Sequence, residues 1–300
     1  MLLTVFTPTY NRAHTLPKLY DSLCRQTCKD FKWLIVDDGS SDNTESIISS
    51  WRFENRIDIT YVRQDNGGKM SAHNKGVEMC DTDFFFCVDS DDFLDDKGVE
   101  TIIHNLPHCS DDWVCGLVAY RLMKHEDSYR ILARFPHPYG YSTLSDLYRQ
   151  GFRGETSLVF KTHVLREFPF PIVEGEKFIT EAYVYNQIDK VYKLYLVDMG
   201  LIYCEYMQAG YTHNDLSLKL KYPMGWCLYY YQKKCTETDS RVRRGYEAKS
   251  YSYYLMCRNR QYAKKMHVDF GGIEVKIRGY LIYILRRFKY RKEIRLLDSS

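Results

Sequence analysis

The stretch FFFCVDSDDFLDD, residues 84–96, places a short apolar run directly before five aspartates that fall within eight positions. An apolar run of this length between polar residues is typical of a buried strand. Ionised carboxylates at the end of such a strand must be paired, solvated or bound to a metal ion. The stretch therefore predicts a strand whose carboxyl end carries a polar site.

Similar apolar runs precede this stretch, and amphipathic segments separate them. Such alternation is the pattern of a parallel sheet covered by helices. The predicted strands cover 2–6, 32–36, 57–62 and 84–88, and the predicted helices cover 15–27, 43–53 and 69–80. We therefore expect an α/β fold with a mixed, mostly parallel sheet flanked by helices.

The second half of the chain is less regular. Further strands are predicted at 113–120, 157–161 and 194–206, with a helix at 179–190. From residue 215 onward the pattern turns helical and becomes rich in Tyr, Lys and Arg. We therefore expect a first domain at 1–214 and a helical, basic, Tyr-rich C-terminal region at 215–300.

Composition and length restrict the class of protein. Three hundred residues with 45% hydrophobic content suit one large α/β domain with a smaller appendage. The ten cysteines show no CxxC pair and no metal-type Cys/His spacing, which favours free buried thiols. The sequence shows no signal-type start and no run of about 18 apolar residues, so we expect a cytoplasmic protein.

Polar turns follow the first two predicted strands, as TPTYNR (7–12) and DDGSSDNT (37–44). In open α/β sheets, ligands bind outside the carboxyl ends of the strands, near the point where the strand order reverses. We therefore expect these two turns and DSDD (89–92) to converge on one crevice.

Three aspartates directly follow the fourth strand: Asp89, Asp91 and Asp92. Their carboxylates suit Mg²⁺ or Mn²⁺ shared with phosphate oxygens, because such ions bind through one or two carboxylates plus the substrate. The alternative is a helix start, in which Asp91 or Asp92 caps a helix beginning near Phe93. Asp95 and Asp96 would then lie in its first turn, which is the favoured explanation for these two residues.

The turn after the second strand offers four polar side chains. Asp37 or Asp38 can accept hydrogen bonds from the edge of a nucleotide base, whereas Asp42 or Thr44 can cap the following helix. The Gly39-Ser40 turn is a weak signal by itself.

The remaining turn residues suit a nucleotide. Pro8 stiffens the exit from the first strand, Tyr10 offers a ring for stacking on a base, and Arg12 can bind phosphate. In NGGKMSAHNKG (66–76), two glycines allow close backbone approach and Lys69 suits phosphate. GxGxxG and Walker patterns are absent, which argues against a nicotinamide dehydrogenase or a P-loop NTPase.

In this order and spacing, PTYNR, VDDGSSD, NGGKxxAxNxG and VDSDD resemble the motifs of family 2 inverting glycosyltransferases with the GT-A fold, of the bacterial cell-surface polysaccharide type. The resemblance covers roughly the first 110 residues. It implies a nucleotide-binding part at about 1–120 and an acceptor part at about 121–214. It also implies a nucleoside-diphosphate sugar donor, most commonly UDP-linked, and Mn²⁺ or Mg²⁺.

The resemblance assigns roles to individual residues. The base and ribose would be held by Thr7, Pro8, Tyr10, Arg12 and Asp38. Asn66 and Lys69 would line the donor pocket. Asp89 and Asp91 match the DxD motif, the first near the ribose and the second on the metal, with Asp92 assisting.

Inverting transfer needs a general base that deprotonates the acceptor hydroxyl. The family usually supplies it from the Asp of an ED pair, and no ED pair occurs in the expected region here. In VEGEKFITEAYVYN (173–186), Glu181 is the predicted base and Glu176 the alternative; Glu181 could also only stabilise a helix start. Further on, EYMQAGYTHN (205–214) resembles the segment that folds over the diphosphate, with Thr212, His213 and Asn214 as donor contacts.

The basic segment 273–297 interleaves apolar and basic residues. As a helix it would place one apolar face between basic flanks: Ile277, Tyr280, Leu281, Ile284, Leu285 and Phe288. That profile indicates either contact with an anionic membrane surface or a C-terminal helix docked on the domain. No nucleic-acid partner is expected, because no recognition motif accompanies the charge.

The leading hypothesis is therefore a metal-dependent inverting glycosyltransferase acting on a saccharide or polyprenyl-linked saccharide, at the inner face of the cytoplasmic membrane if the tail binds lipid. One alternative is a nucleotidyltransferase, which also uses aspartate pairs and Mg²⁺. The other is a non-catalytic binder of sugar nucleotides or polysaccharides that retained the fold and lost the base.

Overall fold

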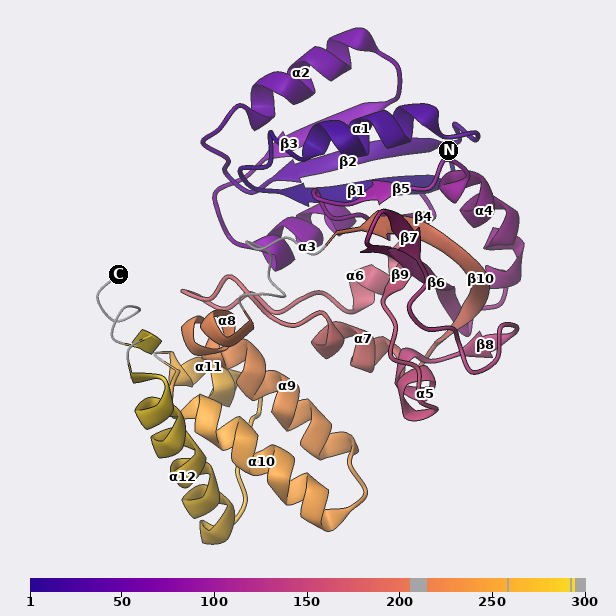
Figure 1. Cartoon of the computed structure of the whole chain (residues 1–300). Coiled ribbons are helices and arrows are strands. Elements are labelled where there is room, and N and C mark those ends of the chain that lie inside the picture. The colour runs from indigo at the N-terminus through magenta and orange to yellow at the C-terminus, as the bar shows by residue number, and fades with distance from the viewer. Residues whose placement is uncertain (206–214, 258, 292, 295–300) are drawn as a thin grey trace. The chain divides into compact units, whose positions relative to one another are not determined.

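The computed structural model describes residues 1–205, 215–257, 259–291 and 293–294 (Figure 1). The chain forms two compact units. Met1–Phe170 and Tyr185–Tyr206 belong to the first unit, and Pro171–Val184 and Met207–Ser300 belong to the second. Each unit is described by itself below.

A ten-stranded mixed sheet forms the first unit, in the order β3-β2-β1-β4-β9-β6-β10-β5, with β7 on β6 and β8 on β10. The strands are β1 Leu3–Thr9, β2 Phe31–Asp37, β3 Ile59–Arg63, β4 Phe84–Cys87, β5 Phe93–Leu94, β6 Val114–His125, β7 Ser128–Arg130, β8 Tyr141–Ser142, β9 Thr156–Lys161 and β10 Lys193–Cys204. Strands β3, β2, β1 and β4 run parallel, as do β6 and β10, whereas β9 is antiparallel to β4 and β6. The α/β prediction is thereby confirmed.

Helices cover both faces of the parallel strands, with α1 and α2 on one side and α3 on the other (Figure 1). The helices of the first unit are α1 Leu16–Arg25, α2 Thr44–Glu54, α3 Lys69–Met79, α4 Gly98–Asn105, α5 Leu144–Arg149 and α6 Thr162–Glu167, and α7 Ala182–Ile188 crosses from the second unit into the first. Tyr20, Trp33 and Trp51 stack between α1, α2 and β2. On the opposite face, a Cβ at Gly76 of α3 would lie 2.3 Å from the ring of Phe6, so this glycine lets α3 pack directly on β1.

The strand order reverses between β1 and β4, because β1 leads through β2 and β3 on one side and has β4 on the other. This is the kind of switch point at which α/β sheets bind ligands beyond the carboxyl ends of their strands. The turns TPTYNR, DDGSSDNT and DSDD all leave the sheet at this edge.

One local prediction is wrong. Phe93 does not begin a helix, because Phe93 and Leu94 form β5 and pair with Tyr203 and Ile202 of β10. Helix α4 starts only at Gly98. Asp95 accepts hydrogen bonds from the Lys97 N–H at 3.0 Å and the Tyr203 hydroxyl at 2.8 Å.

Helices alone make up the described elements from residue 215 onward: α8 Asp215–Lys221, α9 Pro223–Thr236, α10 Ser240–Tyr254, α11 Arg260–Lys265 and α12 Ile273–Lys289. No disulfide forms among the ten cysteines, all of which lie in the described part of the chain. Among the described helices, none combines the length and the apolar character needed to cross a bilayer.

Glu205, directly after β10, ties this strand to three neighbouring elements. It forms ion pairs with Lys18 of α1 at 2.6 Å and Lys124 of β6 at 3.3 Å, and it accepts a hydrogen bond from the Tyr129 hydroxyl of β7. The hydrogen bonds from Lys18 and Tyr129 lower the pKa of Glu205 to about 2.

We expect Glu205→Gln to reduce the free energy of unfolding by up to about 1 kcal/mol near neutral pH, since the carboxylate is partly exposed. The folded pKa lies below the ordinary value of 4.5, so the contribution is present above that value and is lost as the pH falls toward 2. Thermal unfolding of both proteins between about pH 6 and about pH 3 should therefore show a shrinking difference. A constant difference would contradict the prediction.

Candidate active site at the carboxyl edge of the sheet

The loops after β1 and β2 are joined by hydrogen bonds. Asn11 has a φ of 53°, and its N–H donates to Ser40 Oγ at 2.8 Å while its Oδ1 accepts from the Ser41 N–H at 2.8 Å. The Ala13 N–H donates to Asp42 Oδ2 at 3.0 Å. Asp42 Oδ1 also accepts from the N–H of Thr44, the first residue of α2, at 3.1 Å, while the N-cap residue itself is Asn43. The two turns therefore converge, as the sequence predicted.

Asp38 holds the glycine loop after β3. Its Oδ1 accepts from the Gly67 N–H and from Gln64 Nε2, and its Oδ2 accepts from the Gly68 N–H, each at 2.8 Å. Asn66 Nδ2 donates back to the Asp38 carbonyl oxygen at 2.8 Å. Both carboxylate oxygens of this buried residue are thus engaged within the protein, and its expected contact with the base or ribose stays a prediction.

Replacing Asp38 by alanine should therefore lower stability. Three donors would lose a buried, charged acceptor, and we expect the free energy of unfolding to fall by about 3 kcal/mol. Urea unfolding followed by circular dichroism measures this change. The matched control is Asp65→Ala in the same loop, where the exposed side chain predicts a change within about 0.5 kcal/mol. Equal effects of the two substitutions would contradict the role given to Asp38.

The aspartates after β4 contact two cations. Lys69, the first residue of α3, lies 2.6 Å from Asp89 Oδ1, and Arg121 of β6 lies 3.7 Å from Asp89 Oδ2. Burial alone would raise the pKa of Asp89, but the charges of Lys69 and Arg121 outweigh it and lower the pKa to about 2. The loop held by Asp38 thus leads directly into a residue that neutralises Asp89.

Asp92 is buried and is held by the same arginine, with Arg121 Nη1 2.9 Å from Asp92 Oδ2. Burial is the largest influence on this carboxyl, and together with the charges of Asp89 and Asp91 it raises the pKa to about 7 against the opposing effect of Arg121. The two carboxyls that share Arg121 therefore have pKa values shifted in opposite directions.

Sequence reasoning did not single out Arg121. Its Nε donates to the Thr156 carbonyl oxygen at 3.1 Å, and its Nη1 also contacts Cys204 Sγ at 3.6 Å. Strand β6 runs beyond the predicted 113–120, and Arg121 is the first residue past that apolar run. A charge at the carboxyl end of a buried strand was the signal that could have identified it.

Asp91 differs from its neighbours because its half-buried carboxylate makes no hydrogen bond or ion pair with the described residues. Within the described ranges, no group of three or more His, Cys, Asp or Glu side chains is arranged to enclose a metal ion. Asp91 offers one available carboxylate, whereas Asp89 and Asp92 already contact cationic side chains. These three residues therefore do not form a metal site made of protein ligands alone. The Asp91 carboxylate does fit a divalent cation that shares its coordination with phosphate oxygens.

The residues expected to hold a nucleotide differ in exposure. Tyr10, the residue directly after β1, is 50% exposed, and Arg12 in the same loop is half-buried. The hydroxyl of Thr7 instead faces the core, where it accepts from Trp33 Nε1 at 2.9 Å, and Pro8 is buried. Thr9 was missed: it is 3% exposed, and its hydroxyl has no hydrogen-bond partner in the described part of the chain.

Comparison with known proteins identifies the family. Residues 4–167, more than half of the chain, match the model described as glycosyl transferase family 2. The chain belongs to glycosyltransferase family 2. The family match covers the four loops described above.

Individual family 2 relatives match over shorter regions. "Glycosyltransferase GlyG" of Streptococcus pneumoniae is 28% identical over 116 residues, which is 38% of this chain and 38% of that protein. The chain thus spans about two fifths or less of the first curated relatives that it matches.

Solved structures show the same fold. Staphylococcus aureus TarS 1–349 in complex with UDP-GlcNAc has a TM-score of 0.62 at 17% identity, covering 100% of this chain and 83% of that one. A mannosyltransferase from Pyrobaculum calidifontis, in complex with GDP-Man and Mn²⁺, has a TM-score of 0.53 at 16% identity and covers 99% and 84%. At these identities the likeness confirms the predicted GT-A type of fold and nothing finer.

The two glutamates considered as the family 2 general base belong to the second unit. Glu181 directly precedes α7, and its carbonyl oxygen accepts from the Val184 N–H at 3.0 Å. Glu176 accepts from the N–H groups of Met224 and Gly225, at 2.7 Å and 3.1 Å, in the first turn of α9. Burial outweighs these two bonds and raises the pKa of Glu176 to about 7. Glu176 therefore caps a helix.

Thr212, His213 and Asn214 lie outside the described residues.

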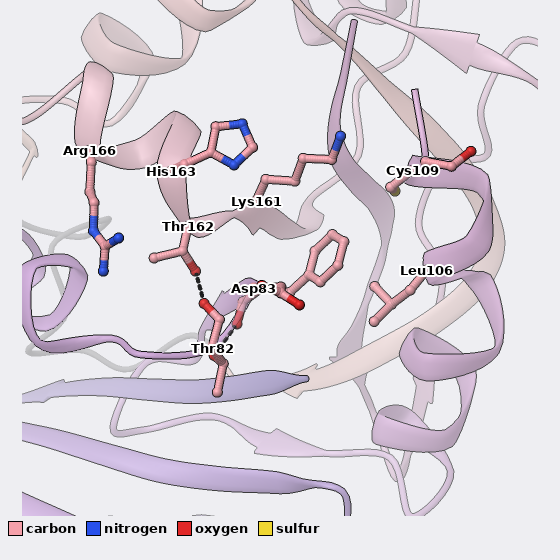
Figure 2. Close-up of a pocket in the computed structure, with 10 residues that line it drawn as sticks. Thr82, Asp83, Leu106, Cys109, Lys161, Thr162, His163 and Arg166 are labelled. Atoms are coloured by element: carbon pink, nitrogen blue, oxygen red, sulfur yellow. Dashed lines mark hydrogen bonds between the residues drawn. The ribbon is translucent and has the colours of Figure 1, made fainter. Parts of the chain in front are cut away.

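A cavity of about 390 Å³ opens elsewhere in the family 2 domain (Figure 2). Its lining includes Thr82 and Asp83, which precede β4, whereas Asp89 and Asp91 follow that strand. Lys161, His163 and Arg166 line it from the end of β9 and from α6. The cavity therefore lies at the opposite edge of the sheet from the four loops and is separate from the candidate active site.

Proposed function

We propose that this protein is a metal-dependent inverting glycosyltransferase that moves a sugar from a UDP-sugar to a hydroxyl of a saccharide or lipid-linked saccharide in cell-surface polysaccharide biosynthesis. The observation that carries the proposal is the unbroken chain of contacts among the four loops at the switch point. Asn11 joins the first loop to the second, Asp38 joins the second to the third, and Lys69 joins the third to Asp89.

The charges at this edge suit a nucleoside diphosphate. Lys69 and Arg121 both contact Asp89, while Tyr10 and Arg12 lie in the loop after β1. In the proposed site Tyr10 stacks on the base and Arg12 contacts phosphate, with residues up to about 120 binding the donor and residues 121–214 facing the acceptor. Cationic groups held in place before the reaction favour the negative charge that grows on the departing diphosphate.

The proposed metal site consists of Asp91, with Asp89 and Asp92 beside it. A bound Mn²⁺ or Mg²⁺ would supply electrostatic stabilisation of the diphosphate oxygens. Because Asp89 and Asp92 already contact Arg121, Asp91 would be the available protein ligand for a metal ion that also binds the donor phosphates.

Inverting transfer breaks the bond between the anomeric carbon and the diphosphate while the acceptor oxygen attacks from the other side. The acceptor proton must then move to a base, and Glu181 is the proposed base. Glu176 is less suited to this role, because both of its carboxylate oxygens already accept backbone N–H groups of α9. Thr212 is proposed to contact the diphosphate.

The proposed place of action is the inner face of the cytoplasmic membrane, where lipid-linked saccharides present their hydroxyl groups. The basic segment 273–297 would bring the enzyme to that surface through anionic lipids.

Product analysis tests the function. Purified protein is incubated with a panel of UDP-sugars, lipid-linked and free saccharide acceptors, and Mn²⁺ or Mg²⁺, and released nucleotides are separated chromatographically. We expect metal-dependent UDP release with inversion at the anomeric carbon. Release of pyrophosphate from a nucleoside triphosphate and a sugar phosphate would instead identify a nucleotidyltransferase. Nucleotide binding without turnover of any pair would identify a non-catalytic binder.

A further inference from the structure

Helix α12 lies alongside α10 in the second unit and presents one defined face to it (Figure 1). Val275 and Gly279 are buried, and a Cβ at Gly279 would lie 2.7 Å from the Ala248 carbonyl oxygen. Arg286 donates to Ser252 Oγ at 2.7 Å and stacks 3.9 Å above the ring of Tyr253. These contacts fix the rotation of α12 about its axis, so its opposite face is also defined.

Apart from the exposed Glu274 in the first turn, the opposite face is apolar, and it is exposed. Phe288 is 78% exposed, Leu285 68%, and Ile277 and Leu281 56% each. At about 100° per residue, this face is centred about 180° away from Val275, Gly279 and Arg286. We name it the outer face of α12; its members are Ile273, Ile277, Tyr280, Leu281, Ile284, Leu285 and Phe288.

Exposed basic residues border the outer face on both sides. Lys276 and Arg287 follow one border, and Arg278 and Lys289 follow the other. An apolar stripe between two basic rows is the profile of a helix that lies in a lipid interface, with the apolar side chains among the acyl chains and the cations at the phosphates.

We propose that the outer face of α12 is a docking surface for an anionic lipid bilayer, into which Ile277, Leu281, Leu285 and Phe288 insert. The side of α12 that packs against α10 would connect the rest of the second unit to the bilayer. The proposal deepens the proposed function and rests on it only for the acceptor being lipid-linked. The surface itself stands on the contacts and exposure of α12.

A second copy of the chain is a poorer occupant. The 17 residues of α12 give an axis of about 25 Å, so the stripe is much smaller than the roughly 800 Å² per partner of a stable interface. A two-fold contact between outer faces would also bring the basic rows of both copies together, and like charges repel. Anionic headgroups complement these rows.

Vesicle binding tests the proposal with the full chain. Flotation is measured with phosphatidylcholine vesicles and with vesicles that also contain phosphatidylglycerol. We expect binding only to the second kind, weakening as salt is added, because headgroup attraction is screened. The triple variant Ile277→Ser, Leu281→Ser, Leu285→Ser should bind about 100-fold more weakly. Phe53→Ser, which changes a 92% exposed side chain on α2, is the matched control and should bind as wild type does.

A second variant tests whether the outer face of α12 inserts into the bilayer. Phe288→Trp should gain tryptophan fluorescence that brominated lipids quench, whereas Phe53→Trp should show no such quenching. Absence of quenching in Phe288→Trp, or equal vesicle binding by wild type and the triple variant, would overturn the proposal. It would also be overturned if light scattering showed that wild type is a dimer and the triple variant a monomer, since the outer face would then join two copies.

The same samples separate this proposal from the proposed function. UDP release in vesicle-free solution should be unchanged in the triple variant. Normal UDP release without vesicle binding would refute the docking surface alone, and vesicle binding without UDP release would refute the transferase alone.

Discussion

Replacing Asp91 by asparagine is expected to reduce UDP-sugar turnover by about a thousandfold, equivalent to about 4 kcal/mol of transition-state stabilisation. The substitution keeps the side-chain volume and removes the one carboxylate of this group that the described residues leave unengaged. The proposed cation would then have no carboxyl ligand from this group beyond the two that contact Arg121. Steady-state UDP release as a function of Mn²⁺ concentration measures the effect.

Asp96→Asn is the matched control, because Asp96 lies in the same acidic stretch but is exposed and pairs with Arg25 at 3.1 Å. A surface ion pair of this kind contributes at most about 1 kcal/mol to stability, and we expect turnover close to that of wild type. If Asp91→Asn kept wild-type turnover with an unchanged Mn²⁺ dependence, the proposed metal site would be wrong.

Replacing Glu181 by glutamine is expected to lower kcat by about 10²- to 10⁴-fold, the range contributed by a general base. Glutamine retains the shape of the side chain but cannot accept the acceptor proton. The KM for the UDP-sugar should change little, because the donor contacts lie on other residues.

Glu176→Gln is the companion variant for this experiment. Its carboxylate accepts two N–H groups at the start of α9, so we expect a lower midpoint of urea unfolding with kcat retained. The opposite result, with kcat lost in Glu176→Gln and kept in Glu181→Gln, would transfer the role of base to Glu176.

Local sequence determined much of the first unit. Strands β1, β2 and β4 and helices α1, α2 and α3 lie within a few residues of the predicted ranges, because each is specified by its own apolar periodicity and by the turns beside it. The four loops could likewise be located from sequence. A polar turn after a parallel strand must lie at the carboxyl edge of the sheet, whatever its distant partners are.

Only the tertiary structure decided what the polar side chains contact. Asp38 faces the amides of Gly67 and Gly68, and Arg121 spans Asp89 and Asp92. These partners lie about 30 residues apart in the sequence. Local sequence patterns do not predict which residues so far apart in the chain come into contact. The predicted helix at Phe93 failed for the same reason, since its segment pairs with β10.

The acidic stretch and the basic tail show the same division between sequence and tertiary structure. The sequence by itself determined that the chain is an α/β protein with an acidic cluster after its fourth strand and an amphipathic basic helix near its end. Tertiary packing decided which carboxylates are neutralised and which face of α12 is covered. The physical reason is that composition and periodicity act within one element, whereas ion pairing and burial depend on which elements the fold brings together.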